Sequence, residues 1–285
     1  MKKTKPVITV LGLCGRSVFL EVDHFHSSGE TVHADSIHIE SGGKGYNQAV
    51  AAARLGASVN FITCCGDDDD GNVCSDFLIG EGIRPLVQKT DKASTAFASI
   101  LTDRCGENQV TVYRGAADYL SADFIRMNEA VFAETDILLL NLEYPLEVNY
   151  AALELAEKYG VRTIMNPAPA RKLDRELLER FFCITPNESE AAVIGFETTC
   201  EIITLGGNGV LVIENGKRVR IPAESTSVVD TTGAGDCFNA ALAVSVARGD
   251  SLTEAAEFAQ KAAAKSVSKR YVMPSLPYIN ELQEK

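Results

Sequence analysis

Short runs of β-branched residues alternate with Ala- and Leu-rich amphipathic stretches along most of this 285-residue chain. The pattern predicts strands at 7–13, 58–64, 137–140 and 161–165, and helices at 46–55, 69–80, 146–159, 174–180, 235–248 and 252–268. Chains that alternate in this way build βαβ units, in which helices cover both faces of a mostly parallel sheet. The sequence therefore predicts an α/β fold, and its length suits one large domain or two ordinary ones.

Two segments interrupt this alternation, at about 19–40 and 94–113. Both contain short alternating strands with little helical periodicity, so we expect them to form a small antiparallel sheet that stands off the main sheet. Such a sheet could act as an active-site lid or be an ordinary edge hairpin. All four histidines fall in the first segment, and none is assigned a catalytic role.

The formal net charge of −12 argues against a nucleic-acid partner, because phosphates require a surface rich in Lys and Arg. A nucleotide stays possible, since backbone N–H groups, a few cations and Mg²⁺ can hold one. No apolar run approaches the ~20 residues that span a bilayer. The apolar stretch after the basic start is too short and too β-branched for a signal peptide. We therefore expect a cytoplasmic protein with no membrane partner.

Eight cysteines are spread along the chain without a C-x-x-C pair, which argues against a zinc site and a disulfide framework. Most are expected to be buried reduced thiols. Cys237 is of interest because it follows Asp236 at a predicted helix start, where thiol pKa values tend to fall. A run of four aspartates at 67–70 could bind a metal, but capping of the helix that follows is favoured.

The strongest motif is V-V-D-T-T-G-A-G-D at 228–236, which leads into an apolar helical stripe. The small residues Gly233, Ala234 and Gly235 let a ligand approach the free N–H groups of the helix start, whose dipole favours an anion. Asp236 in that first turn could be a helix cap or a catalytic base. An anion-binding turn beside a carboxylate suits phosphoryl transfer, in which the carboxylate takes a proton from the attacking hydroxyl.

At this motif the chain resembles the PfkB, or ribokinase-like, carbohydrate kinases, and it is most similar to the ribokinases among them. D-T-T-G-A-G-D is similar to one family signature, and S-G-G-K-G-Y-N-Q-A at 41–49 is similar to the other. Four more stretches match in order, around Glu143 and at 166–170, 185–190 and 203–207. The resemblance covers nearly the whole chain. It implies a three-layer α/β/α sandwich with a mostly parallel central sheet and a small β-sheet lid. It also implies one kinase domain over 1–285 and a homodimer formed through the lids.

The resemblance implies ATP-dependent phosphorylation of a hydroxymethyl group on a small sugar, ribose or a related pentose. Asp236 would be the general base, and Gly233, Ala234 and Gly235 would hold the transferring phosphoryl group. Lys44 and Asn47 are three positions apart on one helical face after a Gly-rich turn, which suits a hydroxylated substrate. By resemblance, the residues that contact the acceptor would be Gly43, Lys44, Asn47, Glu143 and Ser17.

The nucleotide side is predicted from the C-terminal half. Asn187 and Glu190 could be a helix cap with its first-turn acid; by resemblance they organise Mg²⁺ and the phosphates, with Glu190 binding the metal through water. Thr204, Gly206 and Gly209 would line the nucleotide together with Asn187. A monovalent cation, K⁺, would be held by Asp230, Thr232 and Ser275.

The sequence departs from the family pattern where a substrate-binding Asp usually follows the first strand. Ser17 occupies that position, with Gly15 and Arg16 before it. One hydroxyl in place of a carboxylate leaves other acceptors open: a nucleoside, a fructose-type sugar, or a modified or anionic sugar. A homologue that senses a sugar or nucleotide without turnover is a further alternative. The segment 195–200 is short for the family, and Tyr271 stands near the cation loop where Gly is common.

Overall fold

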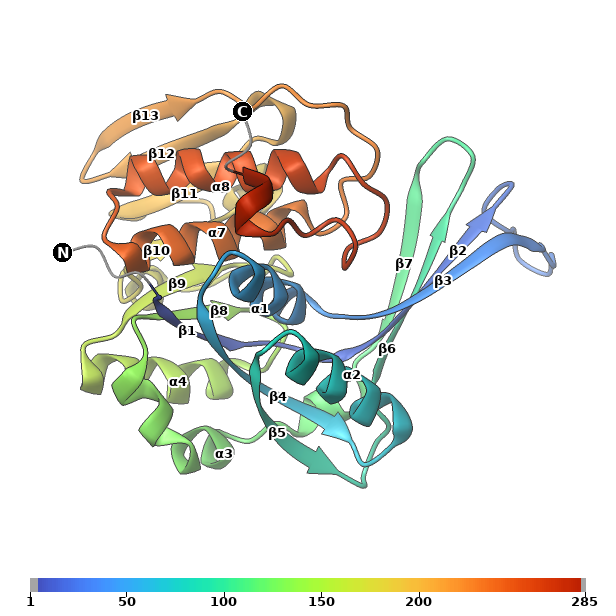
Figure 1. The fold of residues 1–285 in the computed structure, drawn as a ribbon, viewed down its shortest axis with the longest axis horizontal. Coiled ribbons are helices and arrows are strands. Elements are labelled where there is room, and N and C mark those ends of the chain that lie inside the picture. The colour runs from blue at the N-terminus through green and yellow to red at the C-terminus, as the bar shows by residue number, and fades with distance from the viewer. Residues whose placement is uncertain (1–4, 283–285) are drawn as a thin grey trace.

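Nine strands form the main sheet of the computed structural model, which describes residues 5–282 (Figure 1). Their order across the sheet is β13-β12-β11-β10-β9-β8-β1-β4-β5. Pairing is parallel from β11 to β5, whereas β12 and β13 are antiparallel additions at one edge. The bounds are β1 Val7–Leu11, β4 Ser58–Gly66, β5 Arg84–Thr90, β8 Ile137–Asn141, β9 Arg162–Asn166, β10 Cys183–Ile184, β11 Cys200–Thr204, β12 Val210–Glu214 and β13 Lys217–Ile221.

Helices cover both faces of this sheet, because the central strands are apolar on both sides. Along β8, Ile137 and Leu139 join one buried cluster, while Leu138 and Leu140 join the other. The first cluster includes helices α1 (Lys44–Arg54), α2 (Asp69–Gly80), α7 (Ala234–Arg248) and α8 (Leu252–Ser266). The second includes α3 (Ala122–Met127), α4 (Leu146–Tyr159), α5 (Arg175–Leu178) and α6 (Glu188–Ile194). The predicted three-layer α/β/α arrangement is confirmed.

A second sheet of four strands, the lid sheet, projects from the main body (Figure 1). Its order is β3-β2-β6-β7, with bounds β2 Gly15–Val22, β3 Ala34–Gly42, β6 Ala96–Thr102 and β7 Asn108–Tyr113. The two predicted segments do form this sheet, but the purely antiparallel pairing was wrong. Strands β2 and β6 pair in parallel, because they come from separate segments that both run outward from the main sheet.

Most predicted elements lie within two or three residues of the observed ones, and α2 and α4 agree at both ends. The helix predicted at 174–180 is only the four-residue α5. Asp68 accepts a hydrogen bond from the Gly71 amide, so the aspartate run caps α2 as favoured. Short 3₁₀ helices lie at Gly115–Tyr119, Glu129–Glu134, Gly206–Asn208 and Ile279–Leu282. No helix follows α6 before β11, which agrees with the short segment noted there.

Between residues 5 and 282, none of the helices combines the length and apolar character needed to cross a membrane. The same part of the chain contains no group of three or more His, Cys, Asp or Glu side chains arranged to hold a metal ion. The basic residues at 2–3 and the last three residues lie outside the described part.

Candidate active site

The N-terminus of α7 forms the floor of the candidate site. Gly233 is its N-cap, with a φ of 77° that favours glycine. A Cβ atom on Gly233 would lie 2.6 Å from Cγ1 of Val272, so this position also lacks space for a side chain. The first amides of the 15-residue helix have no partner within the helix, and its dipole favours an anion there. The predicted anion-binding turn is therefore present as a geometric feature.

Asp236 is buried in the first turn of α7 and receives two side-chain hydrogen bonds from α1. Asn47 Nδ2 donates to one carboxylate oxygen at 2.8 Å, and Gln48 Nε2 donates to the other at 3.3 Å. Burial raises the pKa of Asp236 to about 6, while the charge of Lys44 and the bond from Asn47 oppose that rise. Such a carboxylate can exchange a proton near neutral pH.

Glu143 lies beside the Gly-rich turn, and its carboxylate binds backbone there. It follows β8 and accepts hydrogen bonds from the amides of Leu13 at 3.0 Å, Lys44 at 2.8 Å and Gly45 at 3.0 Å. The N-cap of α1 is Gly43, with a φ of 124° and no side chain to cap the helix. Glu143 therefore supplies the missing cap and fixes the turn that carries Lys44 and Asn47.

Lys44 links the two sides of the site electrostatically. The negative charge of Asp236 raises the pKa of Lys44, burial opposes that shift, and Glu143 and Glu190 add to it. These three carboxylates come from α7, the end of β8 and α6. A single ammonium group thus influences both the candidate acceptor side and the candidate nucleotide side.

Ser17 lies beside the Gly-rich turn. A Cβ atom built on Gly42 would lie 2.8 Å from Oγ of Ser17 and 3.8 Å from Oδ1 of Asn47. Arg16, the next residue along β2, points to the opposite face of the strand. It lies 3.3 Å from the carboxylate of Asp70. Arg16 is thus paired away from Ser17.

The predicted nucleotide residues cluster around the start of α6 and the end of β11. Asn187 and Glu190 form a reciprocal capping box, in which each side chain accepts the other's amide at 2.8 Å. Asn187 and Thr204 are joined by a parallel β-bridge. Gly206 begins the short 3₁₀ turn that follows, and Gly209 is its C-cap. Both readings of Asn187 and Glu190 remain compatible, because a capping carboxylate still has lone pairs for a water ligand.

Two of the three predicted cation residues interact with each other. Asp230 Oδ1 accepts from the amide and hydroxyl of Thr232, at 2.9 and 2.7 Å. Its Oδ2 accepts from the amide of Tyr271 at 3.0 Å. Ser275 is buried and donates instead to the carbonyl of Val272 within its own turn. The Asp230 carboxylate thus holds the loop together through N–H and O–H donors.

Two polar residues that the sequence analysis did not single out belong to this region. Gln48 holds Asp236 and also donates to Asn166 Oδ1 at 3.2 Å. Its signal was a second amide directly after Asn47, at the start of the Ala-rich part of the helix. Glu40, in the lid sheet, is buried and binds backbone near α7. The lowered thiol pKa suggested for Cys237 was wrong, because burial raises that pKa to about 12.

Comparison with known proteins identifies the family. The family model described as pfkB family carbohydrate kinase matches residues 6–279. The chain belongs to this family.

Curated relatives include a ribokinase of Haemophilus influenzae, 38% identical across 100% of this chain and 98% of the relative. A deoxyribokinase of Salmonella typhi is 30% identical over 97% of each chain. A ribokinase structure from Thermotoga maritima superposes with a TM-score of 0.88 at 32% identity, covering 98% of each chain. A ribokinase from Arabidopsis thaliana, complexed with ribose and ATP, gives 0.87 at 26% identity over 99% of this chain and 98% of that one. This pfkB-family chain is therefore an ATP-dependent carbohydrate kinase with the ribokinase-like fold.

Proposed function

We propose that this pfkB-family kinase transfers the γ-phosphoryl group of ATP to a hydroxymethyl group of ribose or a related pentose. The observation that carries the proposal is the buried carboxylate of Asp236, with a pKa raised to about 6, in the first turn of α7 beside the backbone amides at the start of that helix. A base and an anion-binding turn are two of the groups that phosphoryl transfer to an alcohol uses.

In this mechanism Asp236 accepts the proton of the attacking hydroxyl as the new P–O bond to the sugar forms. The bond between the γ-phosphorus and the bridging oxygen of ATP breaks, and ADP leaves. The amides of Gly233, Ala234 and Gly235 stabilise the charge on the transferring phosphoryl oxygens. Asn47 and Gln48 hold the two carboxylate oxygens of Asp236, so the base keeps one orientation. The ammonium group of Lys44 favours the ionised form of Asp236 and offsets phosphate charge.

Unpaired acceptor atoms beside Asp236 support a hydroxylated substrate. Within residues 5–282, Asn47 Oδ1 and Gln48 Oε1 are buried without a hydrogen-bond partner. A buried acceptor without a donor is costly, and a sugar hydroxyl would supply one. Together with Gly43, Lys44 and Ser17 these atoms would contact the acceptor, while Glu143 shapes the turn that presents them. Ribose is favoured because ribokinases are among the similar proteins, and a deoxyribose-type acceptor remains the first alternative.

ATP would lie along Asn187, Thr204, Gly206 and Gly209. Mg²⁺ fits this side, since it typically keeps several waters and needs only one or two carboxylates besides the nucleotide phosphates. Glu190 is a buried carboxylate near Lys44 and could bind a water of that ion. The ion would supply charge neutralisation on the phosphates. Any effect of K⁺ that involves Asp230 and Thr232 would act through the loop that these two residues hold together. Comparing turnover in K⁺ with turnover in choline tests whether the reaction depends on K⁺.

The deciding experiment is ATP consumption by the purified protein with Mg²⁺ and K⁺ across pentoses, hexoses, deoxy sugars and nucleosides. Turnover with ribose, competed by 2-deoxyribose only weakly, supports the proposal. Turnover with another acceptor alone would support the same mechanism with a different substrate. Ser17 and its neighbours would then be the residues that determine the specificity. No ATP consumption with any member of the panel would favour a sensing role without turnover.

We further propose that two copies associate through the lid sheet. Supporting this, one face of that sheet carries exposed apolar side chains from three strands. Strand register places them together: Ile39 is opposite Val18, Ile37 is opposite Leu20, and Phe97 is opposite Tyr113. Ile37, Ile39, Phe97 and Tyr113 are each at least 40% exposed.

A further inference from the structure

The turn at 271–276 connects the lid sheet to the start of α7. Its residue Val272 packs against Gly233, because a Cβ on that glycine would lie 2.6 Å from Val272 Cγ1. Its residue Tyr271 donates its amide to Asp230 at 3.0 Å. The turn therefore supports both ends of the loop 230–233 that precedes the anion-binding amides.

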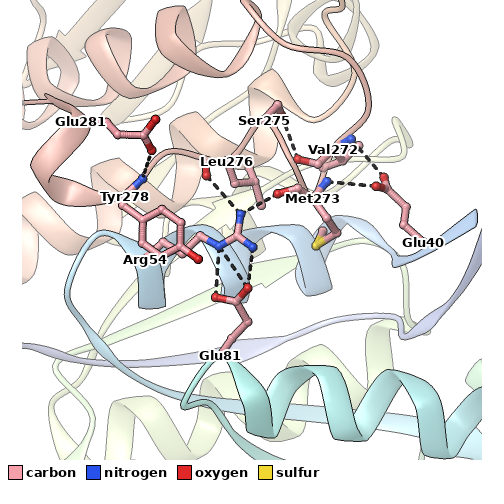
Figure 2. Close-up of polar contacts among 9 residues, drawn as sticks. All are labelled: Glu40, Arg54, Glu81, Val272, Met273, Ser275, Leu276, Tyr278 and Glu281. Carbon is pink, nitrogen blue, oxygen red and sulfur yellow. Dashed lines mark hydrogen bonds and ion pairs between the residues drawn. The ribbon is translucent and has the colours of Figure 1, made fainter. Parts of the chain in front are cut away.

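Glu40 of strand β3 holds this turn from the lid side (Figure 2). Its carboxylate oxygens accept the amides of Val272 at 3.0 Å and Met273 at 3.2 Å. The Glu40 side chain is only 7% exposed, so both bonds are shielded from water. These bonds span more than 230 positions of sequence, and they join the lid sheet directly to the support of α7.

A second lid contact fixes the backbone one residue earlier. Tyr271 has a φ of 64°, a left-handed conformation that a residue with a side chain adopts at a cost. Its ring stacks on the His38 ring, with centroids 3.8 Å apart and planes 13° apart. Phe19, which is opposite His38 in the lid sheet, contacts the Tyr271 ring edge-on, with ring centroids 5.4 Å apart. The lid thus holds Tyr271 in a conformation that the chain would not favour alone.

Arg54 holds the other side of the turn, as Figure 2 shows. Its guanidinium donates to the carbonyls of Met273 at 2.5 Å and Leu276 at 3.1 Å, and it is paired with Glu81. Both Arg54 and Glu81 belong to the main body. Glu40 therefore adds a polar contact from the lid to a turn that Arg54 anchors to the main body.

We propose that Glu40 is a positioning residue for phosphoryl transfer. Glu40 connects the lid sheet to the contact between Val272 and Gly233. The anion-binding amides are therefore in the correct position only when the lid sheet is docked on the turn at 271–276. The proposal rests on the function proposed above. Glu40 contacts neither phosphate nor acceptor in this account. It acts through Val272, and small displacements of positioning groups can reduce turnover by orders of magnitude.

Kinetics of Glu40→Ala and Glu40→Gln test this proposal, with Glu21→Gln as the control. Glu21 is a lid carboxylate that binds Arg270 at the surface, one residue before the turn. At saturating substrates we expect Glu40→Ala to lower kcat at least about 10-fold while KM for the sugar changes less than about threefold. Glu40→Gln should be intermediate, because its one carbonyl oxygen can still accept an amide. The kcat of the control variant Glu21→Gln should stay within about twofold of the wild-type value. A kcat for Glu40→Ala within about twofold of wild type would overturn the proposal.

A double-mutant cycle separates positioning from general loss of stability. Val272→Ala removes the packing on Gly233 but leaves the amide that Glu40 binds. If Glu40 acts through Val272, the double variant should be no slower than the slower single variant. Effects on kcat that multiply would show independent action and contradict the proposal. Should Glu40→Ala fail to fold, the cycle is run with Glu40→Gln.

Hydrogen exchange keeps the test independent of turnover. The amides of Val229, Ala234 and Cys237 are hydrogen-bonded around the loop. In Glu40→Ala they should exchange at least about 10-fold faster, with the second half of α7 unchanged. If the wild type phosphorylates no sugar, the proposed function fails. Faster exchange of these amides in Glu40→Ala would still support the connection between the lid sheet and the start of α7. Unchanged exchange at these amides would overturn the connection itself.

Discussion

Asn47 Nδ2 lies 2.8 Å from the Asp236 carboxylate, although 189 positions of sequence separate the two residues. The contact joins the first turns of α1 and α7, and so brings the two signature motifs of the family together. One motif contributes the buried carboxylate of Asp236, and the other contributes the side-chain amides of Asn47 and Gln48 that hold it.

The pH dependence should reflect the ionisation of Asp236. Burial raises its pKa to about 6, and only the ionised form can accept the proton of the sugar hydroxyl. We therefore expect kcat/KM to fall as pH decreases through about 6. Initial rates from pH 5 to 8 would check this. A kcat/KM that stays constant down to pH 5, as expected for an aspartate with an ordinary pKa, would contradict the assignment.

Lys44 should influence that limb through its charge. Since the Lys44 ammonium lowers the pKa of Asp236, Lys44→Met should move the acidic limb to higher pH as well as slow turnover. Lys261→Met, an exposed lysine on α8, is the control and should leave the profile in place. A Lys44→Met limb at the wild-type pH would show that the two groups are not coupled.

Glu143 should matter for stability as much as for substrate binding. Glu143→Gln leaves one oxygen to accept three amides, so we expect a loss of about 1–3 kcal/mol in the free energy of unfolding. Chemical denaturation would measure it against Glu147→Gln, an exposed carboxylate on α4. Equal stability of the two variants would exclude the capping role.

The lid-to-lid association predicts a specific sensitivity to charge. Ile39→Glu places a carboxylate in the exposed apolar face of the lid sheet and should shift a dimer to monomers. Val219→Glu, on the exposed edge strand β13, should not. Light scattering would report both masses. A wild-type protein that is monomeric at micromolar concentration would rule out the association.

Much of the fold was predictable because its signals are local. The two signatures and the alternation of strands and helices indicated the layers, the lid segments and the turn that carries Asp236. The parallel pairing of β2 with β6 was not, since it depends on how two distant segments leave the main sheet.

The same limit applies to the candidate site. The family resemblance predicted Glu143 at the acceptor side, but its bonds to three amides follow from tertiary contacts about 100 or more positions apart. The contact of Glu40 with the turn at 272–273 likewise has no local pattern, and neither does the left-handed backbone of Tyr271. Burial, which raised the pKa of Cys237, outweighed the helix-start effect that its position suggested.

The most direct test of the account is the turnover of Asp236→Asn with the best sugar acceptor, measured beside its affinity for ATP. The substitution keeps the size of the side chain but removes the base. We predict normal folding, nucleotide binding within about threefold of wild type, and kcat lower by at least about 100-fold. Turnover close to that of the wild type, in a variant that binds ATP normally, would contradict the role of Asp236 as the catalytic base.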